Sequence, residues 1–124
     1  MSSILIVDDE LAIAEVLASI LGDAGYQVAV AANGKQALSR LAENKPRLIV
    51  TDYMMPVIGG AELIAAVKRD SALRNIPIVI MTSISERKVK EQCRGYDAYL
   101  RKPFQLREVL SIVRKLAGPS TASV

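Results

Sequence analysis

The stretch ILIVDDE, residues 4–10, decides the fold, because four apolar residues run directly into three acids. A short run with apolar residues on both faces is typical of a β-strand that is covered on both sides. Such strands occur in parallel sheets that have helices packed on each face. The acids Asp8, Asp9 and Glu10 repel one another, so they either project into solvent or surround a positive charge.

The rest of the chain alternates similar strands with amphipathic helices. Apolar runs predict strands at 4–8, 27–32, 47–52, 76–83 and 98–101. Helical spacing predicts helices at 11–25, 33–44, 59–70, 85–95 and 106–118, the second of them after a short turn. Five strands that alternate with five helices predict an α/β fold, in which a doubly wound parallel sheet forms the middle of a three-layer sandwich.

Apolar spacing also predicts which helical residues face the core. In the first helix these are Ile13, Val16, Leu17, Ile20 and Leu21. In the last helix they are Leu106, Val109, Leu110, Val113 and Leu116.

Length and composition limit the possible function classes. A chain of 124 residues fits one domain, which we expect at 1–118, followed by a flexible tail or linker start at 119–124. The single cysteine, Cys93, cannot form an internal disulfide and fits a reducing compartment. The sequence has no histidine, which excludes Ser-His-Asp catalysis and histidine-bound zinc. Because no apolar run reaches membrane-spanning length and no signal peptide precedes Ile4, we expect a cytoplasmic protein.

The net charge of +3 hides an uneven distribution of charge along the chain. Residues 1–62 hold four Lys or Arg and eight Asp or Glu, whereas residues 63–124 hold twelve Lys or Arg and five Asp or Glu. No aromatic residues interleave with the basic cluster at 86–94, and no nucleic-acid-binding motif is present. The sequence therefore argues against direct nucleic-acid binding and favours a solvated face, or a face that docks an acidic protein.

Chemically active side chains follow four of the five predicted strands. Asp8 and Asp9 follow the first, Asp52 ends the third, and Thr82 and Lys102 lie at the ends of the last two. The carboxyl ends of parallel strands share one edge of the sheet, where such folds bind ligands. Clustered carboxylates need a cation, and oxygen ligands suit Mg²⁺ or Mn²⁺. A dication, an ammonium and a hydroxyl around one carboxylate suit phosphoryl transfer, with Asp52 as the nucleophile that forms an aspartyl phosphate.

These features resemble the response-regulator receiver domain of two-component signalling. The matching stretches ILIVDDE, LIVTDYMMPVIGG, IPIVIMTS and DAYLRKPF lie in family order and cover nearly all of residues 3–117. The most specific of them is the D-x-x-M-P-x-x-x-G run from Asp52 to Gly60, joined to a downstream Thr and K-P-F. The resemblance implies a flavodoxin-like sheet with strand order 2-1-3-4-5.

The resemblance also implies a metal site and a phosphodonor. Mg²⁺ would be held by Asp8, Asp9, Asp52 and the backbone carbonyl of Met54. Asp52 would accept a phosphoryl group from a phosphohistidine on a sensor histidine kinase or a histidine phosphotransfer protein. We expect Glu10 to serve as a helix-start acid, which the helix dipole favours, rather than as a metal ligand.

The same resemblance implies a conformational switch that controls partner binding. Lys102 would pair with the phosphoryl group, and the Lys102–Pro103 bond resembles the family's cis bond. Thr82 would swing in to bind a phosphoryl oxygen, and Tyr99 would turn inward with it. The output partner is not indicated by the sequence, and the chain would be a monomer or a phosphorylation-dependent dimer.

The chain departs from the usual receiver pattern near the fourth helix. The interval from Thr82 to Lys102 is two residues shorter than usual, and Tyr96 stands where a small residue is common. We expect the phosphorylation chemistry to survive this change, whereas the sequence does not indicate how the shortened region affects the usual coupling between the site and its output.

Three other classes of protein share parts of this pattern. A Mg²⁺-dependent aspartyl-phosphate phosphatase or phosphotransferase for small molecules usually has D-x-D after the first strand and an inserted cap, and VDDE lacks that spacing. A flavin- or nucleotide-binding domain needs a phosphate loop rich in Gly, Ser or Thr, and acids occupy that place. A receiver-like module that only binds proteins would not need the complete set of residues for accepting a phosphoryl group.

Overall fold

A computed structural model describes residues 3–119 of the chain, which form five strands that alternate with five helices. The strands are β1 (Ser3–Val7), β2 (Gln27–Ala31), β3 (Leu48–Asp52), β4 (Ile78–Thr82) and β5 (Ala98–Arg101). The helices are α1 (Leu11–Asp23), α2 (Gly34–Glu43), α3 (Gly60–Arg69), α4 (Glu86–Gln92) and α5 (Leu106–Ala117). The tail expected at 119–124 lies outside the described residues, except for Pro119.

The strands form one parallel sheet in the order β2-β1-β3-β4-β5, which confirms the predicted fold. β3 and β4 are inner strands and are fully buried, as the apolar runs that make up most of their length predict. β2 is an edge strand, and its burial alternates between exposed and half-buried positions. The strand order reverses between β1 and β3, which is where folds of this kind bind ligands.

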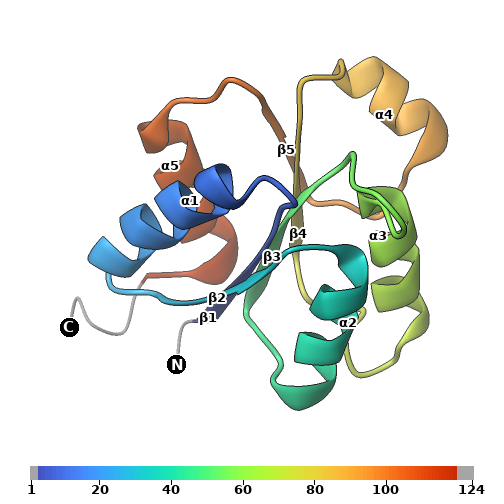
Figure 1. The fold of residues 1–124 in the computed structure, drawn as a ribbon, viewed down its shortest axis with the longest axis horizontal. Helices are drawn as coiled ribbons and strands as arrows, with labels where there is room; N and C mark the ends of the chain where they lie inside the picture. Colours follow the sequence, from blue (N-terminus) through green and yellow to red (C-terminus); the bar gives the residue numbers. More distant parts are fainter. Residues whose placement is uncertain (1–2, 120–124) are drawn as a thin grey trace.

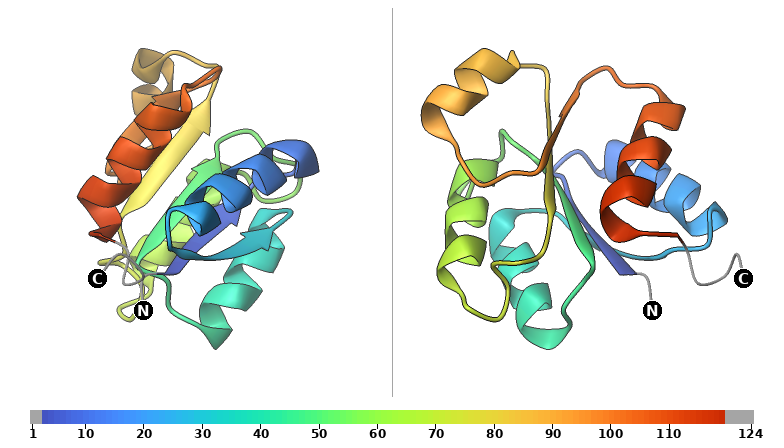
Figure 2. Two further views of the ribbon diagram at one scale, coloured as in Figure 1. Left: turned by 90° about the vertical axis from the view of Figure 1, so that its left-hand side faces the viewer. Right: turned by 180° about the vertical axis from the view of Figure 1, so that it is seen from behind.

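The helices cover the two faces of the sheet in two groups. Figure 1 shows α1 and α5 on one side and α2, α3 and α4 on the other, and the view from behind in Figure 2 shows the same separation. Side chains alternate along each strand, so Ile4 and Ile6 pack against the first group, whereas Leu5 and Val7 pack against the second. This arrangement gives the three-layer sandwich and leaves the strand ends open.

Local hydrogen bonds set the starts of two helices. The Asn33 side chain accepts the backbone N–H of Gln36 at 2.8 Å at the start of α2. The Glu108 side chain accepts the backbone N–H of Gln105 at 2.9 Å at the start of α5. By contrast, Ser85 makes no such side-chain bond at the start of α4.

Two of the residues predicted to face the core are exposed. Leu106 begins α5 and is 51% exposed, and Val16 on α1 is 53% exposed. The buried stripe of α5 instead runs at intervals of four residues through Val109, Val113 and Ala117. That spacing leaves Leu106 at the first turn, beyond the end of the stripe. The helical pattern was therefore predicted correctly, but the width of its buried face was not.

Candidate functional site

The fold brings the predicted chemical residues to one edge of the sheet. Asp8 directly follows β1, Asp52 and Thr82 end β3 and β4, and Lys102 directly follows β5. Val7 is opposite Thr51, Asp52 is opposite Met81, and Thr82 is opposite Arg101 in the strand register. Neighbouring strands therefore end at the same level, which places these side chains in one row.

Lys102 lies at the centre of this row. Its Nζ atom is 3.3 Å from Oδ1 of Asp52, 3.5 Å from Oδ2 of Asp8 and 3.8 Å from Oε1 of Glu10. The Lys102 backbone N–H donates to the Thr82 carbonyl at 2.9 Å, and the Lys102–Pro103 peptide is cis, as the resemblance implied. One ammonium thus contacts three carboxylates while its main chain is fixed against β4.

The carboxylates of Asp8, Glu10 and Asp52 form a compact group. One oxygen of each residue lies within 4.8 Å of one oxygen of each of the others. Asp9 is exposed and lies outside this group among residues 3–119. Glu10 is the N-cap residue of α1, and its carbonyl accepts the backbone N–H of Ala14 at 3.1 Å, whereas its side chain makes no cap hydrogen bond. Glu10 thus stands at the start of α1, as expected, and its carboxylate also reaches the Lys102 ammonium.

Burial and charge set the protonation behaviour of the site. Burial raises the pKa of Asp52 from 3.8 to about 6, the Lys102 ammonium opposes this rise, and the Asp8 charge adds to it. Burial also raises the pKa of Asp8. Burial lowers the pKa of Lys102, but the carboxylates of Asp52 and Asp8 outweigh it and raise the pKa above its ordinary value. Lys102 therefore stays charged at neutral pH, and Asp52 is held in a costly ionised state.

The donor set fits a magnesium ion. Mg²⁺ binds oxygen ligands at about 2.1 Å in an octahedron, so its ligand oxygens lie about 3–4 Å from one another. The oxygens of Asp8, Glu10 and Asp52 already lie within 4.8 Å of one another. A second positive charge among them would relieve the repulsion that Lys102 only partly offsets. The residues present are thus those that would hold the ion, directly or through its waters.

The remaining predicted residues surround this cluster. Thr82 is buried, and its Oγ1 accepts the backbone N–H of Ile84 at 3.2 Å. The half-buried Tyr99 donates its hydroxyl to the Ile84 carbonyl. Thr82 and Tyr99 therefore both contact the backbone of Ile84. Met54 lies two residues after Asp52 with its side chain 62% exposed, and the role of its carbonyl stays a prediction.

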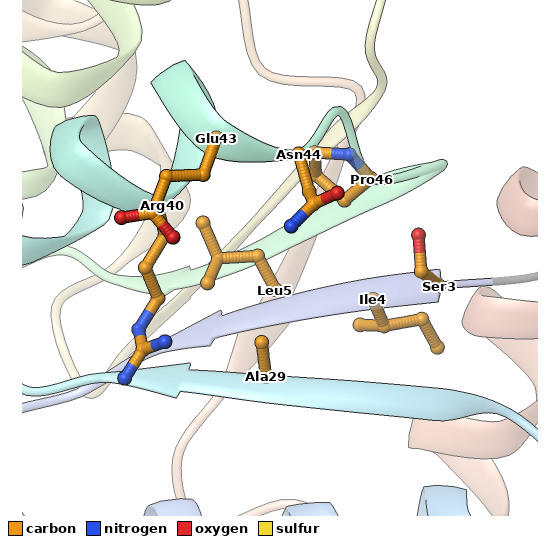
Figure 3. Close-up of a pocket in the computed structure, with 8 residues that line it drawn as sticks. All are labelled: Ser3, Ile4, Leu5, Ala29, Arg40, Glu43, Asn44 and Pro46. Carbon is orange, nitrogen blue, oxygen red and sulfur yellow. The ribbon is translucent and has the colours of Figure 1, made fainter.

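A small cavity lies away from the row of charged residues. Figure 3 shows it between α2 and the strands β1 and β2, with Leu5, Ala29, Arg40 and Glu43 among its lining residues. Its volume of about 90 Å³ is well below the range of small-molecule sites, roughly 300 Å³ and more. It contains no pair of acids, so it does not compete with the carboxyl edge as a chemical site.

Sequence reasoning placed Glu10 at the helix start rather than among the site carboxylates, and it missed two tyrosine contacts. Glu10 follows Asp8 and Asp9 directly, and its place beside them was the available signal. Tyr53 donates its hydroxyl to Gln92 at 3.1 Å, and Tyr96 donates its hydroxyl to Glu86 at 3.2 Å. No sequence pattern indicated these two contacts, because they depend on where α4 lies. Among the described residues, no helix has the length and apolar character needed to cross a membrane.

Comparisons with known proteins agree with this geometry. The family description "Response regulator receiver domain" matches residues 4–114. The phosphate regulon transcriptional regulatory protein PhoB of Pseudomonas aeruginosa is 41% identical over 122 residues, which are 94% of this chain and 53% of PhoB. The chain therefore spans about half the length of the curated relatives it matches.

Solved structures show the same similarity. The chemotaxis protein CheY4 of Vibrio cholerae is 31% identical, with a TM-score of 0.89 over 94% of this chain and 98% of CheY4. The response regulator TrrA of Thermotoga maritima, solved in complex with Mg²⁺-BeF, is also 31% identical, with a TM-score of 0.84 over 94% of this chain and 99% of TrrA. The chain belongs to the response regulator receiver domains, the phosphorylation switches of two-component signalling, and its acidic edge is their Mg²⁺-dependent phosphorylation site.

Proposed function

We propose that Asp52 accepts a phosphoryl group from a phosphohistidine on a sensor histidine kinase or a histidine phosphotransfer protein. Membership of the receiver family implies a cognate histidine kinase. The observation that carries the choice of Asp52 is its position 3.3 Å from the Lys102 ammonium within the group of three carboxylates. Asp52 is also the only one of the three that ends a central, fully buried strand, which holds its carboxylate in place.

The transfer needs one bond to form and one to break. A carboxylate oxygen of Asp52 attacks phosphorus, the phosphorus–nitrogen bond breaks, and its electron pair returns to the imidazole nitrogen. The Lys102 ammonium binds a phosphoryl oxygen as charge develops on it. With a pKa of about 6, Asp52 is mostly ionised at neutral pH and ready to attack. Asp8, Asp9, Asp52 and the Met54 carbonyl would hold Mg²⁺, with the Glu10 carboxylate close to Asp8 and Asp52, and the bound ion would supply further charge neutralisation.

Thr82 and Tyr99 are proposed to convert phosphorylation into a conformational change. Thr82 now accepts the Ile84 N–H, and the same hydroxyl would donate to a phosphoryl oxygen on Asp52. To make that contact, the Thr82 side chain would rotate and release the N–H of Ile84. The carbonyl of Ile84 accepts the Tyr99 hydroxyl, so both switch residues act on the same stretch of backbone. The phosphoryl group can shift the population only because it makes this contact in one of the two states.

An apolar groove beside the site is proposed to receive the histidine-bearing partner. The groove lies between the first half of α1 and the start of α5, and it is lined by Ala12, Ile13, Val16, Leu17, Phe104 and Leu106. Leu11 is also 61% exposed at the start of α1, next to the acids. A helical partner surface with apolar residues would cover the groove and bring its phosphohistidine to Asp52.

A charged residue in this groove is expected to reduce transfer from a histidine-phosphorylated partner. The partner is a histidine kinase that is found by screening kinases for phosphoryl transfer to this chain. In Leu106→Glu, the rate of transfer from this kinase should fall at least about tenfold more than the rate of transfer from a small phosphodonor. The reason is that an unpaired charge in the groove opposes docking of the partner. Ala42→Glu is the matched control, since Ala42 is exposed on α2, on the other face of the sheet. Equal losses from both donors, or an equal loss in the control, would refute the groove as the docking surface.

The remaining parts of the proposal concern the chain as a whole. We place the receiver domain at 1–118 and a tail or linker start at 119–124, consistent with the end of α5 at Ala117. A cytoplasmic location fits the buried free thiol of Cys93. We propose a monomer or a phosphorylation-dependent dimer that acts through protein partners, rather than through direct contact with nucleic acid.

A further inference from the structure

The outer side of β2 is an unprotected strand edge. The sheet order places β2 at one edge of the sheet and β5 at the other. Residues 24–34, which contain β2, hold no charged side chain and no proline. On β5, by contrast, Asp97, Arg101 and Lys102 stand within or directly beside the strand. Charged residues and prolines are common devices that prevent an edge strand from pairing with another chain, so β2 is the edge that is open to such pairing.

The open backbone groups of β2 belong to Val28 and Val30. The Ala31 carbonyl accepts the Asp8 N–H at 3.1 Å, so the backbone groups of Ala31 face β1. Backbone groups alternate in direction along a strand, so those of Ala29 also face β1, whereas those of Val28 and Val30 face outward. In the described part of the chain, no strand lies on that outer side. Val28 and Val30 can therefore each offer an N–H and a C=O group to a further strand.

The outward N–H groups on either side of this stretch already have partners. The Tyr26 N–H donates to the Leu21 carbonyl at 3.1 Å. The Ala32 N–H donates to Oε1 of Gln36 at 2.9 Å. The open stretch is therefore limited to the residues between Tyr26 and Ala32, and Ala29 lies at its centre. This limit fixes the register that an added strand can take.

The sequence of the open stretch suits a second copy of itself. Val28-Ala29-Val30 reads the same in both directions. An antiparallel strand centred on Ala29 places Val28 opposite Val30 of the other copy. Each such pair exchanges two N–H···O=C bonds, which uses all the open groups of both copies. Two valines that face each other across strands also make a favourable side-chain contact.

The side chains on both faces of β2 leave room for this approach. Ala29 is exposed and points from β2 to the α2 side, where it lines the small cavity with Arg40 and Glu43 (Figure 3). Val28 and Val30 are half-buried against the α1 and α5 face. Ala29 and its counterpart would form a non-hydrogen-bonded pair with Cα atoms about 4.5 Å apart. Methyl side chains fit between the two strands at that distance.

We propose that this chain self-associates through β2, so that two five-stranded sheets join into one continuous sheet. The two-fold axis passes between the two copies of Ala29, and the outward groups of Val28 and Val30 make the contact. The contact is symmetric and uses the only unprotected edge, so association stops at two copies. It is a monomer–dimer equilibrium that needs no phosphoryl group. It is therefore separate from the phosphorylation-dependent dimer of the proposed function and goes beyond that function.

Charged substitutions at the centre of the contact test this proposal. Ala29 is exposed in the monomer, and the oppositely charged Arg40 and Glu43 lie nearby, so Ala29→Glu and Ala29→Lys should both fold. Sedimentation equilibrium without a phosphodonor should show a monomer–dimer equilibrium for the wild type. In either variant alone, the dissociation constant of the dimer should weaken at least about tenfold, because like charges lie directly opposite each other.

A mixture of Ala29→Glu and Ala29→Lys should recover the dimer, because opposite charges then face each other across the two-fold axis. This recovery distinguishes a contact centred on Ala29 from a general effect of added charge. Ala65→Glu and Ala65→Lys are the matched controls, since Ala65 is exposed on α3, away from β2. Both controls should dimerise like the wild type, alone and in a mixture.

A cross-link gives a second measurement that does not depend on added charge. With a mild oxidant, Ala29→Cys should form a disulfide between two copies, because Cα atoms about 4.5 Å apart lie within the range of disulfides. Ala65→Cys should stay uncross-linked under the same conditions. The native Cys93 thiol is buried and does not compete.

Three results would overturn the inference. They are a wild type that stays monomeric up to its highest soluble concentration, charged Ala29 variants that dimerise like the wild type, and an Ala29→Cys variant that cross-links no faster than Ala65→Cys. A mixture of the two charged variants that stays monomeric would overturn the two-fold register. Asp52→Asn should dimerise like the wild type, so a failure of the proposed phosphorylation and a failure of this inference are observed separately.

Discussion

Asp52→Asn is expected to raise the free energy of unfolding at pH 7.5 by about 1–3 kcal/mol in the absence of Mg²⁺. Burial raises the pKa of the Asp52 carboxyl from 3.8 to about 6, so the fold holds the ionised group at a cost. Asparagine has nearly the same shape and no charge. Loss of the contact with Lys102 offsets part of the gain, and Lys102 keeps Asp8 and Glu10 as partners.

The pH dependence gives the sign of this effect. Between about pH 4 and pH 6 the folded wild type holds a proton on Asp52 that the unfolded chain has lost, so its stability falls as pH rises. Asp52→Asn has no titrating group at this position, so it does not lose this stability. The difference in free energy of unfolding between the two proteins should therefore be largest above about pH 6 and vanish below about pH 4.

Urea unfolding of both proteins from pH 4 to pH 8, in a chelator, measures this difference. Asp23→Asn, at an exposed position at the end of α1, controls for the removal of an acid. Added Mg²⁺ should stabilise the wild type more than Asp52→Asn, because binding to the folded state alone adds stability. The claim that burial destabilises the ionised Asp52 would be contradicted if Asp52→Asn were less stable than the wild type at pH 7.5. It would also be contradicted if the difference in free energy of unfolding did not depend on pH.

Gly60→Ala is expected to destabilise the fold by about 2–4 kcal/mol and to weaken Mg²⁺ binding. A Cβ atom on Gly60 would lie 2.8 Å from the Asp52 carbonyl oxygen and 2.8 Å from Cα of Tyr53. Both are backbone atoms, so Asp52, the proposed phosphoryl acceptor, and Tyr53 must move. The glycine of the D-x-x-M-P-x-x-x-G run is therefore explained by the close approach of α3 to the end of β3.

Gly22→Ala provides the contrast, because a Cβ atom on Gly22 would have nothing within 4 Å and the residue lies within α1. It is expected to stabilise the protein by about 0.5–1 kcal/mol, the helix preference of alanine over glycine. Thermal unfolding and Mg²⁺ titration of the two variants test the pair. If Gly60→Ala were as stable as the wild type and bound Mg²⁺ equally well, the proposed constraint on the site would be wrong.

The strands and the charged edge were predictable because each depends on a short-range pattern. Apolar runs gave the five strands, and the carboxyl ends of parallel strands must share an edge. That rule predicts that Asp8, Asp52, Thr82 and Lys102 lie at one edge of the sheet, as they do. The sheet order was available only through the resemblance to receiver domains, since periodicity does not specify which strands are neighbours.

The parts that were not predictable depend on three-dimensional placement of single side chains. Glu10 contacts Lys102 because α1 begins one residue later, which aims its carboxylate at the site rather than along the helix. Leu106 is exposed because it lies at the first turn of α5, outside the buried stripe of Val109, Val113 and Ala117. The contact between Tyr53 and Gln92 joins residues 39 positions apart, and a pattern within one segment cannot reveal it.

The departure from the family pattern near α4 now has a structural counterpart. The interval between Thr82 and Lys102 is short, and α4 has only seven residues. Tyr96, which stands where a small residue is common, bonds to the first of them. The helix predicted at 85–95 ends at Gln92 instead, because Cys93 takes an extended conformation. The shortened interval thus corresponds to a short helix with side-chain bonds at both ends.

The central claim is that Asp52 accepts a phosphoryl group with the help of the acids and Lys102 around it. Mass measurement of the intact chain, incubated with Mg²⁺ and a small phosphodonor such as acetyl phosphate, tests it directly. The account predicts a gain of one phosphoryl group that disappears in Asp52→Asn and on chelation of Mg²⁺. Equal labelling of Asp52→Asn and the wild type, or labelling that does not depend on Mg²⁺, would contradict it.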